Sequence, residues 1–212
     1  MKYKRAPVIL LLILLAAAGI RFIYLREYSA QPEFVSPSID AAYHDYWARN
    51  LAAGEWSPPR DYEDPDIPHH PFFRPPGYPY LLALIYRLVG TDYVFPRIFQ
   101  AALGLAAVLA GFIFARNRYG EITGLIFAAL LGFYWIFIYY EGELLGTSLA
   151  VFLTVLLLAA LSRWGERAGP GAGLISGLML GLFSLFRPNI LLFAPASGIW
   201  FWFRTRGRMP AK

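Results

Sequence analysis

The chain has 212 residues, of which 58% are hydrophobic, and its formal net charge is +5. A chain this apolar must bury most of its surface in lipid or against other lipid-embedded helices, which excludes a soluble globular protein and predicts an all-α integral membrane protein. There is no cysteine, so disulfides and thiolate zinc sites are excluded. The basic residues cluster at the ends of apolar runs, which indicates membrane orientation and argues against nucleic-acid binding.

The first apolar run, residues 7–26, follows the basic residues Lys2, Lys4 and Arg5. The small residues 16–19 resemble a signal-peptide cleavage site, but the hydrophobic stretch continues beyond them and exceeds an ordinary signal sequence in length. We therefore predict a retained first span, with a signal peptide as the alternative.

A polar loop, residues 27–93, separates this span from the rest of the chain. Near its end, the apolar stretch 78–89 has only about 12 residues and is too short to cross a ~30 Å hydrocarbon core. If it did cross, the turn with Arg116 and Arg118 would lie outside, against the positive-inside rule. We therefore predict juxtamembrane helices at the outer interface within this loop.

Further apolar segments follow, most of them close to the ~20 residues that a span requires. With a cytoplasmic N-terminus, six spans place the basic turns and the basic C-terminal tail inside. The sequence thus predicts one membrane domain over residues 1–212, a polytopic bundle of about six spans in the plasma membrane with both termini cytoplasmic. After the first span and the extracytoplasmic loop, the predicted segments are 94–115, 121–140, 144–162, 172–187, 189–203 and a tail at 204–212.

Asp40 follows the first span closely and should therefore lie near the outer membrane surface. Beyond it, Tyr43, Trp47 and Leu51 fall on one stripe at helical spacing, which predicts a short amphipathic helix on the membrane with Asp40 near its N-terminus. Helix capping alone is the commoner role for such an aspartate. The motifs elsewhere in the chain favour a catalytic role.

Several short motifs occur in a fixed order, and together they resemble the GT-C membrane glycosyltransferases, with the closest likeness to the branch of protein O-mannosyltransferases and aminoarabinose transferases. The motifs are Ile39-Asp-Ala-Ala-Tyr-His44, Arg74-Pro-Pro-Gly-Tyr-Pro79, Pro96-Arg97, Arg116-Asn-Arg-Tyr-Gly120, Gly142-Glu-Leu-Leu145 and Gly181-Leu-Phe-Ser-Leu-Phe-Arg-Pro188. The resemblance implies a polyprenyl-phosphate-linked sugar as donor and a protein, lipid or glycan as acceptor. Because members of that class usually have more helices, it also implies an N-terminal module, for which a second polypeptide completing the fold is one explanation.

The resemblance also implies roles for single residues. In that class the first-loop acid acts as general base or orients the acceptor, and Asp40 stands at the matching position. Negative charge accumulates on the departing lipid phosphate, and Arg74, Arg97 and Arg187 are the outward-side candidates to meet it. Headgroup anchoring explains the first two equally well. The other candidate substrate-binding residues are Tyr43, His44, Tyr78 and Glu143.

Metal binding and two non-enzymatic functions stay open as alternatives. Some relatives bind a divalent metal, Mg²⁺ or Mn²⁺, through outer-loop acids, and Asp40 with Glu141 or Glu143 could supply such oxygen ligands. A non-catalytic membrane subunit or lipid-binding scaffold is a second reading, and a small transporter is a third. A transporter predicts ionisable residues in mid-span, whereas the three central segments hold none apart from Arg97 near one end.

Overall fold

The computed structural model describes residues 5–56, 74–164 and 170–206, and the regular elements in these ranges are all helices. Together with the apolar character of the long helices, this confirms the predicted all-α membrane class. The elements are α1 (Ala6–Tyr28), the 3₁₀ helix η1 (Pro32–Phe34), α2 (Ile39–Ala53), α4 (Gly77–Val89), α5 (Val94–Tyr119), α6 (Glu121–Phe133), α7 (Trp135–Gly142), α8 (Thr147–Trp164), α9 (Pro170–Ser184), the 3₁₀ helix η2 (Pro188–Leu192) and α10 (Phe193–Arg206).

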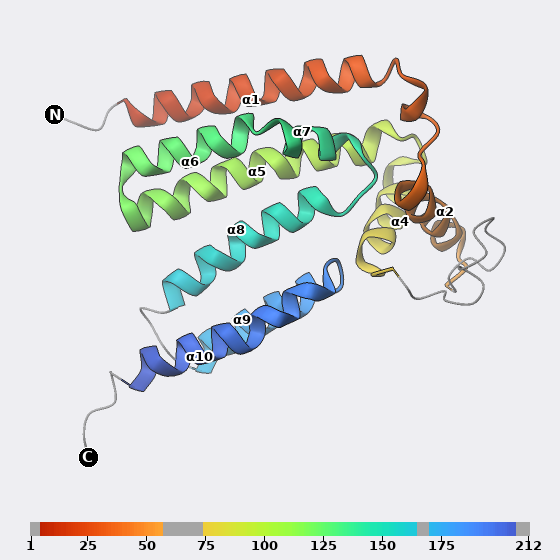
Figure 1. Ribbon diagram of the computed structural model, residues 1–212. Helices are drawn as coiled ribbons and strands as arrows, with labels where there is room; N and C mark the ends of the chain where they lie inside the picture. Colours follow the sequence, from red (N-terminus) through yellow and green to blue (C-terminus); the bar gives the residue numbers. More distant parts are fainter. Residues whose placement is uncertain (1–4, 57–73, 165–169, 207–212) are drawn as a thin grey trace.

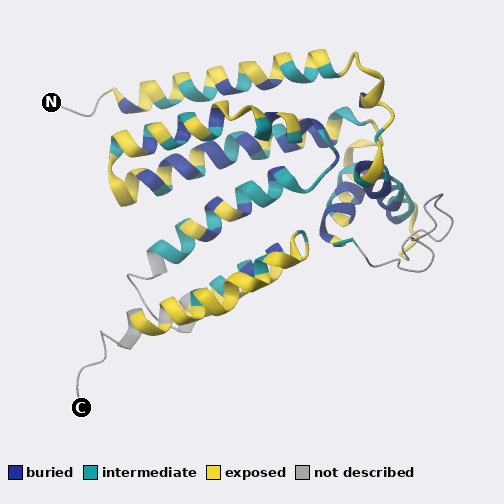
Figure 2. Cartoon of the chain, viewed as in Figure 1, coloured by how far each residue is buried: buried dark blue, intermediate teal, exposed yellow. Residues whose placement is uncertain are grey.

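The long helices lie roughly side by side and alternate in direction, while α2 and α4 close one end of the bundle (Figure 1). The central helix is α5, which contacts α1, α6, α7 and α8. Its buried side chains contrast with the largely exposed surfaces of α1 and α10 (Figure 2). The start of α1 and the end of α10 lie at the end of the bundle opposite α2 and α4, so the two ends are built from different elements (Figure 1).

Two helices in the described ranges, α1 and α5, are long and apolar enough to cross a membrane. The predicted span 121–140 is broken: α6 and α7 meet at an angle of 45°, and the pair is apolar and long enough to be one bent span or a re-entrant loop. The break lies at Tyr134, whose extended backbone (φ −70°, ψ 102°) interrupts the helix. The Arg21 guanidinium donates a hydrogen bond of 2.9 Å to the carbonyl of Gly132, just before the break, and so satisfies a backbone group at that point.

The last two predicted spans, 172–187 and 189–203, correspond to α9 and α10. The structure separates these helices with η2, which begins at Pro188 as the sequence break predicts. The apolar parts of α8 and α9 are shorter than a full span. The total of about six spans therefore stays a prediction beyond α1, α5 and the bent pair.

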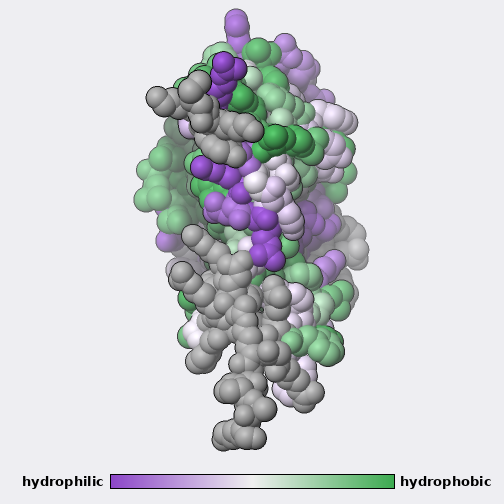
Figure 3. Space-filling model, turned by 90° about the vertical axis from the view of Figure 1, so that its left-hand side faces the viewer, coloured by the Kyte–Doolittle hydropathy of each residue, from purple (hydrophilic) through white to green (hydrophobic). Residues whose placement is uncertain are grey.

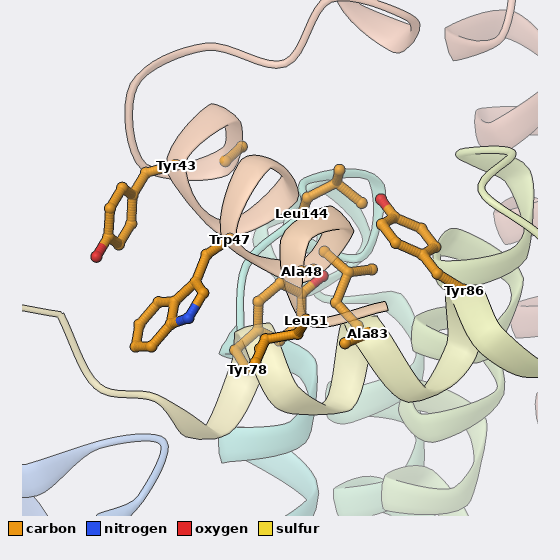
Figure 4. Packing of buried hydrophobic residues seen from close by; sticks show 10 residues of the cluster. Tyr43, Trp47, Ala48, Leu51, Tyr78, Ala83, Tyr86 and Leu144 are labelled. Carbon is orange, nitrogen blue, oxygen red and sulfur yellow. The ribbon is translucent and has the colours of Figure 1, made fainter. Parts of the chain in front are cut away.

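The helices α2 and α4 pack against each other around an aromatic core (Figure 4). The predicted stripe of Tyr43, Trp47 and Leu51 exists, but all three side chains are at most 4% exposed. They face α4, where Leu82 and Tyr86 lie in the same cluster. The stripe therefore builds a small folded cap and is covered by protein, while the position of α2 at the membrane surface stays a prediction.

A buried carboxylate, Asp45, fastens this cap to the bundle. It accepts hydrogen bonds of 2.5 Å from the Tyr86 hydroxyl on α4 and 2.7 Å from the Tyr93 hydroxyl, just before α5. One helical turn further along α2, Arg49 pairs with it at 2.9 Å. Burial and the bond to Asp45 raise the pKa of Tyr86, so the phenol stays protonated and continues to donate. The network fixes where α2 sits, and with it the residues at the start of that helix.

Candidate functional site

A cavity of about 630 Å³ lies at the capped end of the bundle. Its walls come from the start of α2, the start of α4, the turn between α7 and α8, and the break between α9 and η2, segments far apart in the sequence. The lining residues are Asp40, His44, Arg74, Pro75, Tyr78, Tyr140, Leu145, Gly146, Thr147, Phe186, Arg187, Pro188 and Asn189. Five sequence-predicted site residues are thus brought together in one place: Asp40, His44, Arg74, Tyr78 and Arg187.

Asp40 sits in the first turn of α2 and forms an ion pair with Arg74. Both side chains are a little more than one third exposed, so the pair is accessible from the cavity. The preceding residue, Ile39, adopts φ 50°, a left-handed conformation that is strained for a β-branched side chain. Strain of this kind tends to occur beside functional residues, and here it sets the start of the helix that carries the carboxylate.

His44, one turn after Asp40, is held as a neutral imidazole. Its Nδ1 lies 3.1 Å from the carbonyl oxygen of Leu144, and because a carbonyl can only accept, Nδ1 must carry the hydrogen. Burial lowers the pKa of His44, the nearby charges of Arg74 and Arg187 lower it further, and the Leu144 bond and Asp40 partly oppose this. The neutral ring therefore keeps Nε2 as a proton acceptor in the cavity region.

Gly77 explains how Arg74 and Arg187 come to share one cavity. Its N–H donates a 2.8 Å hydrogen bond to the carbonyl of Leu185, at the end of α9. A Cβ at position 77 would lie 2.6 Å from that same oxygen, so only glycine permits this approach. On the other side of the contact, Arg187 donates 3.3 Å to the Thr147 hydroxyl at the start of α8. The Pro-Pro-Gly motif thus docks the start of α4 onto the α9 break.

Gln100 on α5 fixes Tyr78, one of the residues that line the cavity. The ring of Tyr78 lines the cavity, while its hydroxyl points inward and donates 2.7 Å to Oε1 of Gln100. The amide nitrogen of Gln100 donates 2.7 Å to each of two carbonyls, those of Glu141 and Glu143. One buried amide therefore links α4 to the turn that leads into α8.

Arg97 lies outside the cavity, although the sequence suggested a phosphate contact. It is 1% exposed, and its guanidinium donates 2.6 Å to the carbonyl of Gly142 and 2.8 Å to that of Phe34. It also lies 3.9 Å from the centre of the Phe34 ring. These contacts join α5 to η1 and to the end of α7, which is a structural role.

Two other predicted substrate-binding residues also lie apart from the cavity lining. Tyr43 belongs to the aromatic core between α2 and α4. Glu143 accepts a hydrogen bond of 3.2 Å from the Tyr28 hydroxyl at the end of α1. Its carbonyl is one of the groups that Gln100 holds, so its position serves the turn beside the cavity.

The acids suggested for a metal are dispersed. Glu141 is buried against Arg21, with a closest N–O distance of 2.8 Å, and Glu143 is bound by Tyr28, while Asp40 pairs with Arg74. Within the described ranges, no group of three His, Cys, Asp or Glu side chains is close enough to hold a metal ion. As the structure places them, these three acids do not form a divalent-cation site with one another, and we derive no chemical step through one.

Sequence reasoning missed three polar residues of the cavity lining and the residue behind them. Tyr140, Thr147 and Asn189 have no motif of their own, but each lies next to a helix break or helix end. Gln100 is a polar residue inside a spanning helix, which indicates a hydrogen bond to a neighbouring helix because lipid offers no partner. That sign could have identified it.

An all-helical membrane bundle with a carboxylate and two arginines around a cavity at one end fits the GT-C class of membrane glycosyltransferases. Residues 73–211, more than half of the chain, match the sequence profile of the family described as dolichyl-phosphate-mannose-protein mannosyltransferase, and the chain belongs to this family. No curated protein and no solved structure matches the chain. The family match includes Arg74, Tyr78 and Arg187 but begins after Asp40, so the likeness around Asp40 rests on its loop motif.

Proposed function

We propose that this glycosyltransferase moves a sugar from a polyprenyl-phosphate-linked donor to a hydroxyl of a protein, lipid or glycan acceptor, with Asp40 as general base. The observation that carries the proposal is the cavity in which the Asp40 carboxylate lies beside the Arg74 and Arg187 cations. The family description, which names a lipid-phosphate-linked mannose, supports a donor of this class.

The reaction needs one carboxylate. The acceptor oxygen bonds to the anomeric carbon as the bond from that carbon to the phosphate oxygen breaks. The acceptor proton passes to the Asp40 carboxylate, and the electron pair leaves with the lipid phosphate. A single displacement of this kind inverts the anomeric centre, so a second carboxylate is not required.

Charge on the departing phosphate is met by the arginines of the cavity. Arg187 is exposed and lies at the break between α9 and η2, where its one described partner is a neutral hydroxyl. Arg74 is shared: it pairs with Asp40 and faces the same cavity. A phosphate that draws Arg74 toward itself would free the Asp40 carboxylate to contact the acceptor hydroxyl, which couples donor binding to acceptor binding.

We further propose that the cavity lies on the extracytoplasmic face of the plasma membrane. Arg116 and Arg118 stand at the opposite end of α5, and the positive-inside rule assigns that end to the cytoplasm. A second polypeptide that completes the fold is compatible with this arrangement. N-glycosylation acceptor sites inserted at residue 27 and residue 120 would test the orientation, because glycosylation of the second site alone would show the opposite orientation.

Transfer of radiolabelled sugar from a panel of polyprenyl-phosphate sugars, in membranes that contain the chain, tests the chemistry. Asp40→Asn should abolish transfer while Glu33→Gln, a control at an exposed carboxylate of the same loop, should leave it unchanged. Activity that survives Asp40→Asn would refute the base. If no variant and no wild-type chain transfers sugar, but the chain still binds polyprenyl phosphate, the lipid-binding scaffold is the better reading.

A further inference from the structure

Two adjoining apolar cavities lie at the end of the bundle opposite the candidate site. One, of about 420 Å³, is enclosed by the ends of α5 and α8 and by α10; the other, of about 320 Å³, lies between α5 and α8. They share Phe114, Arg118 and Ser162 and so form one groove. Figure 3 views this end and shows hydrophilic side chains near its middle, with hydrophobic surface beside them.

The groove is too narrow for a helix but has room for a hydrocarbon chain. A helix with side chains is ~10 Å across, so even three turns occupy well over ~1,000 Å³, more than both cavities together. The walls are mostly apolar, with Leu158, Leu161 and Phe193 in the larger cavity and Ile113 in the smaller. Within a membrane, an acyl chain is the apolar group at hand to fill such a slot.

Charge at the mouth of the groove selects the headgroup. Arg118 lines both cavities, and Tyr119 lines the larger one beside it, at the last turn of α5. A guanidinium next to a phenolic hydroxyl suits a lipid phosphate, and basic pockets between spanning helices bind anionic headgroups. A lipid with a net negative charge therefore complements this mouth better than a zwitterionic one.

We propose that this groove binds one anionic phospholipid of the leaflet on that side, with an acyl chain between α5, α8 and α10 and its phosphate at Arg118. The sugar donor is a different lipid at a different place. On α5, positions 97 and 118 are 21 residues apart, or about 31 Å along the helix, so a phosphate at Arg118 is remote from Asp40. The bound phospholipid fastens α10 to the central helix.

Trp200 provides a direct readout because it lines the larger cavity. The purified chain is reconstituted in bilayers that contain brominated phosphatidylglycerol or brominated phosphatidylcholine, and the difference between wild type and Trp200→Phe isolates the emission of this tryptophan. We expect half-maximal quenching at about fivefold lower mole fraction of the anionic lipid, the factor for one arginine near a lipid phosphate.

Two variants and one control decide the interpretation. Arg118→Gln should remove the fivefold preference, while Arg116→Gln, the same change of charge on a residue that lines neither cavity, should keep it. Ala196→Phe narrows the slot and should weaken quenching by both lipids. Equal quenching by both lipids in the wild type, or an Arg116→Gln loss as large as that of Arg118→Gln, would overturn the proposal. A dimeric protein in which neither lipid quenches Trp200 would also overturn the proposal, because a second copy of the chain would then occupy the groove. None of these results depends on glycosyl transfer.

Discussion

Arginines occur in two different settings in this molecule, inside the bundle and around the cavity. Arg97 is 1% exposed and Arg21 is 3% exposed, and both donate to backbone carbonyls of other helices. Arg187 and Arg74 line the cavity and keep a substantial exposed surface. A cation in an apolar segment can therefore have a purely structural role. Only the groups around it distinguish such a structural arginine from one that is available to bind a ligand.

The buried arginines Arg21 and Arg97 bond to backbone groups that the irregular backbone of the α6–α7 pair leaves without helical partners. Where a helix ends or bends within a lipid-embedded bundle, its carbonyls lose their partners and must be satisfied inside the protein. Arg97 and Gln100, one turn apart on α5, donate to three successive carbonyls, those of residues 141–143. Arg21 does the same at Gly132 and pairs with Glu141. The polar interior therefore follows from the broken helix and in turn shapes the turn that lines the cavity.

The largest effect is expected when the buried arginine Arg97 is replaced. Arg97→Leu leaves the buried carbonyls of Gly142 and Phe34 without their donor, at about 1–3 kcal/mol each. We expect the free energy of unfolding to fall by about 3–5 kcal/mol, measured as the loss of folded protein with temperature or denaturant in detergent. If the variant unfolds like the wild type but no longer transfers sugar, Arg97 contributes to substrate binding and not to stability.

Arg187→Gln should show the reverse pattern. The side chain has one described hydrogen bond, of 3.3 Å, and is exposed, so its loss should change the unfolding midpoint little. If Arg187 meets the charge of the departing phosphate, kcat should fall about 10²–10³-fold, as for other preorganised donors at a developing anion. Steady-state transfer assays and the unfolding assay above, run on the same preparation, check both halves. An unchanged kcat would remove Arg187 from the reaction.

The sequence predicted the membrane class, the helix at 94–115 and the break before Pro188, because hydropathy and proline act locally. It also selected Asp40, Arg74 and Arg187, which lie within recognisable motifs and which line one cavity in the structure. It could not assign Arg97, since whether an arginine faces a carbonyl or a cavity depends on a helix bend more than thirty residues away. The same holds for the stripe at Tyr43, whose partner helix α4 lies beyond a long loop.

His44 offers the finest test, because it stands between the two settings: it lines the cavity, yet Leu144 holds its ring and burial keeps it neutral. Its folded-state pKa is lower than the ordinary value of 6.5, mainly through burial, with Arg74 and Arg187 adding to the effect. The unfolded chain therefore binds this proton at a higher pH than the folded chain does. Stability from the neutral ring is complete above pH 6.5 and is lost as the pH falls toward the folded-state pKa.

The variant His44→Asn isolates this contribution, since an amide can still donate to the Leu144 carbonyl but does not titrate. Between pH 7.5 and about 5, the wild type should lose more stability than the variant, because only the wild type has a ring whose pKa is lower in the folded chain than in the unfolded chain. The difference between the two unfolding curves, taken at each pH, cancels the carboxylates and the other histidines. Parallel curves would mean that folding does not lower the pKa of His44, which would contradict a ring held neutral by burial.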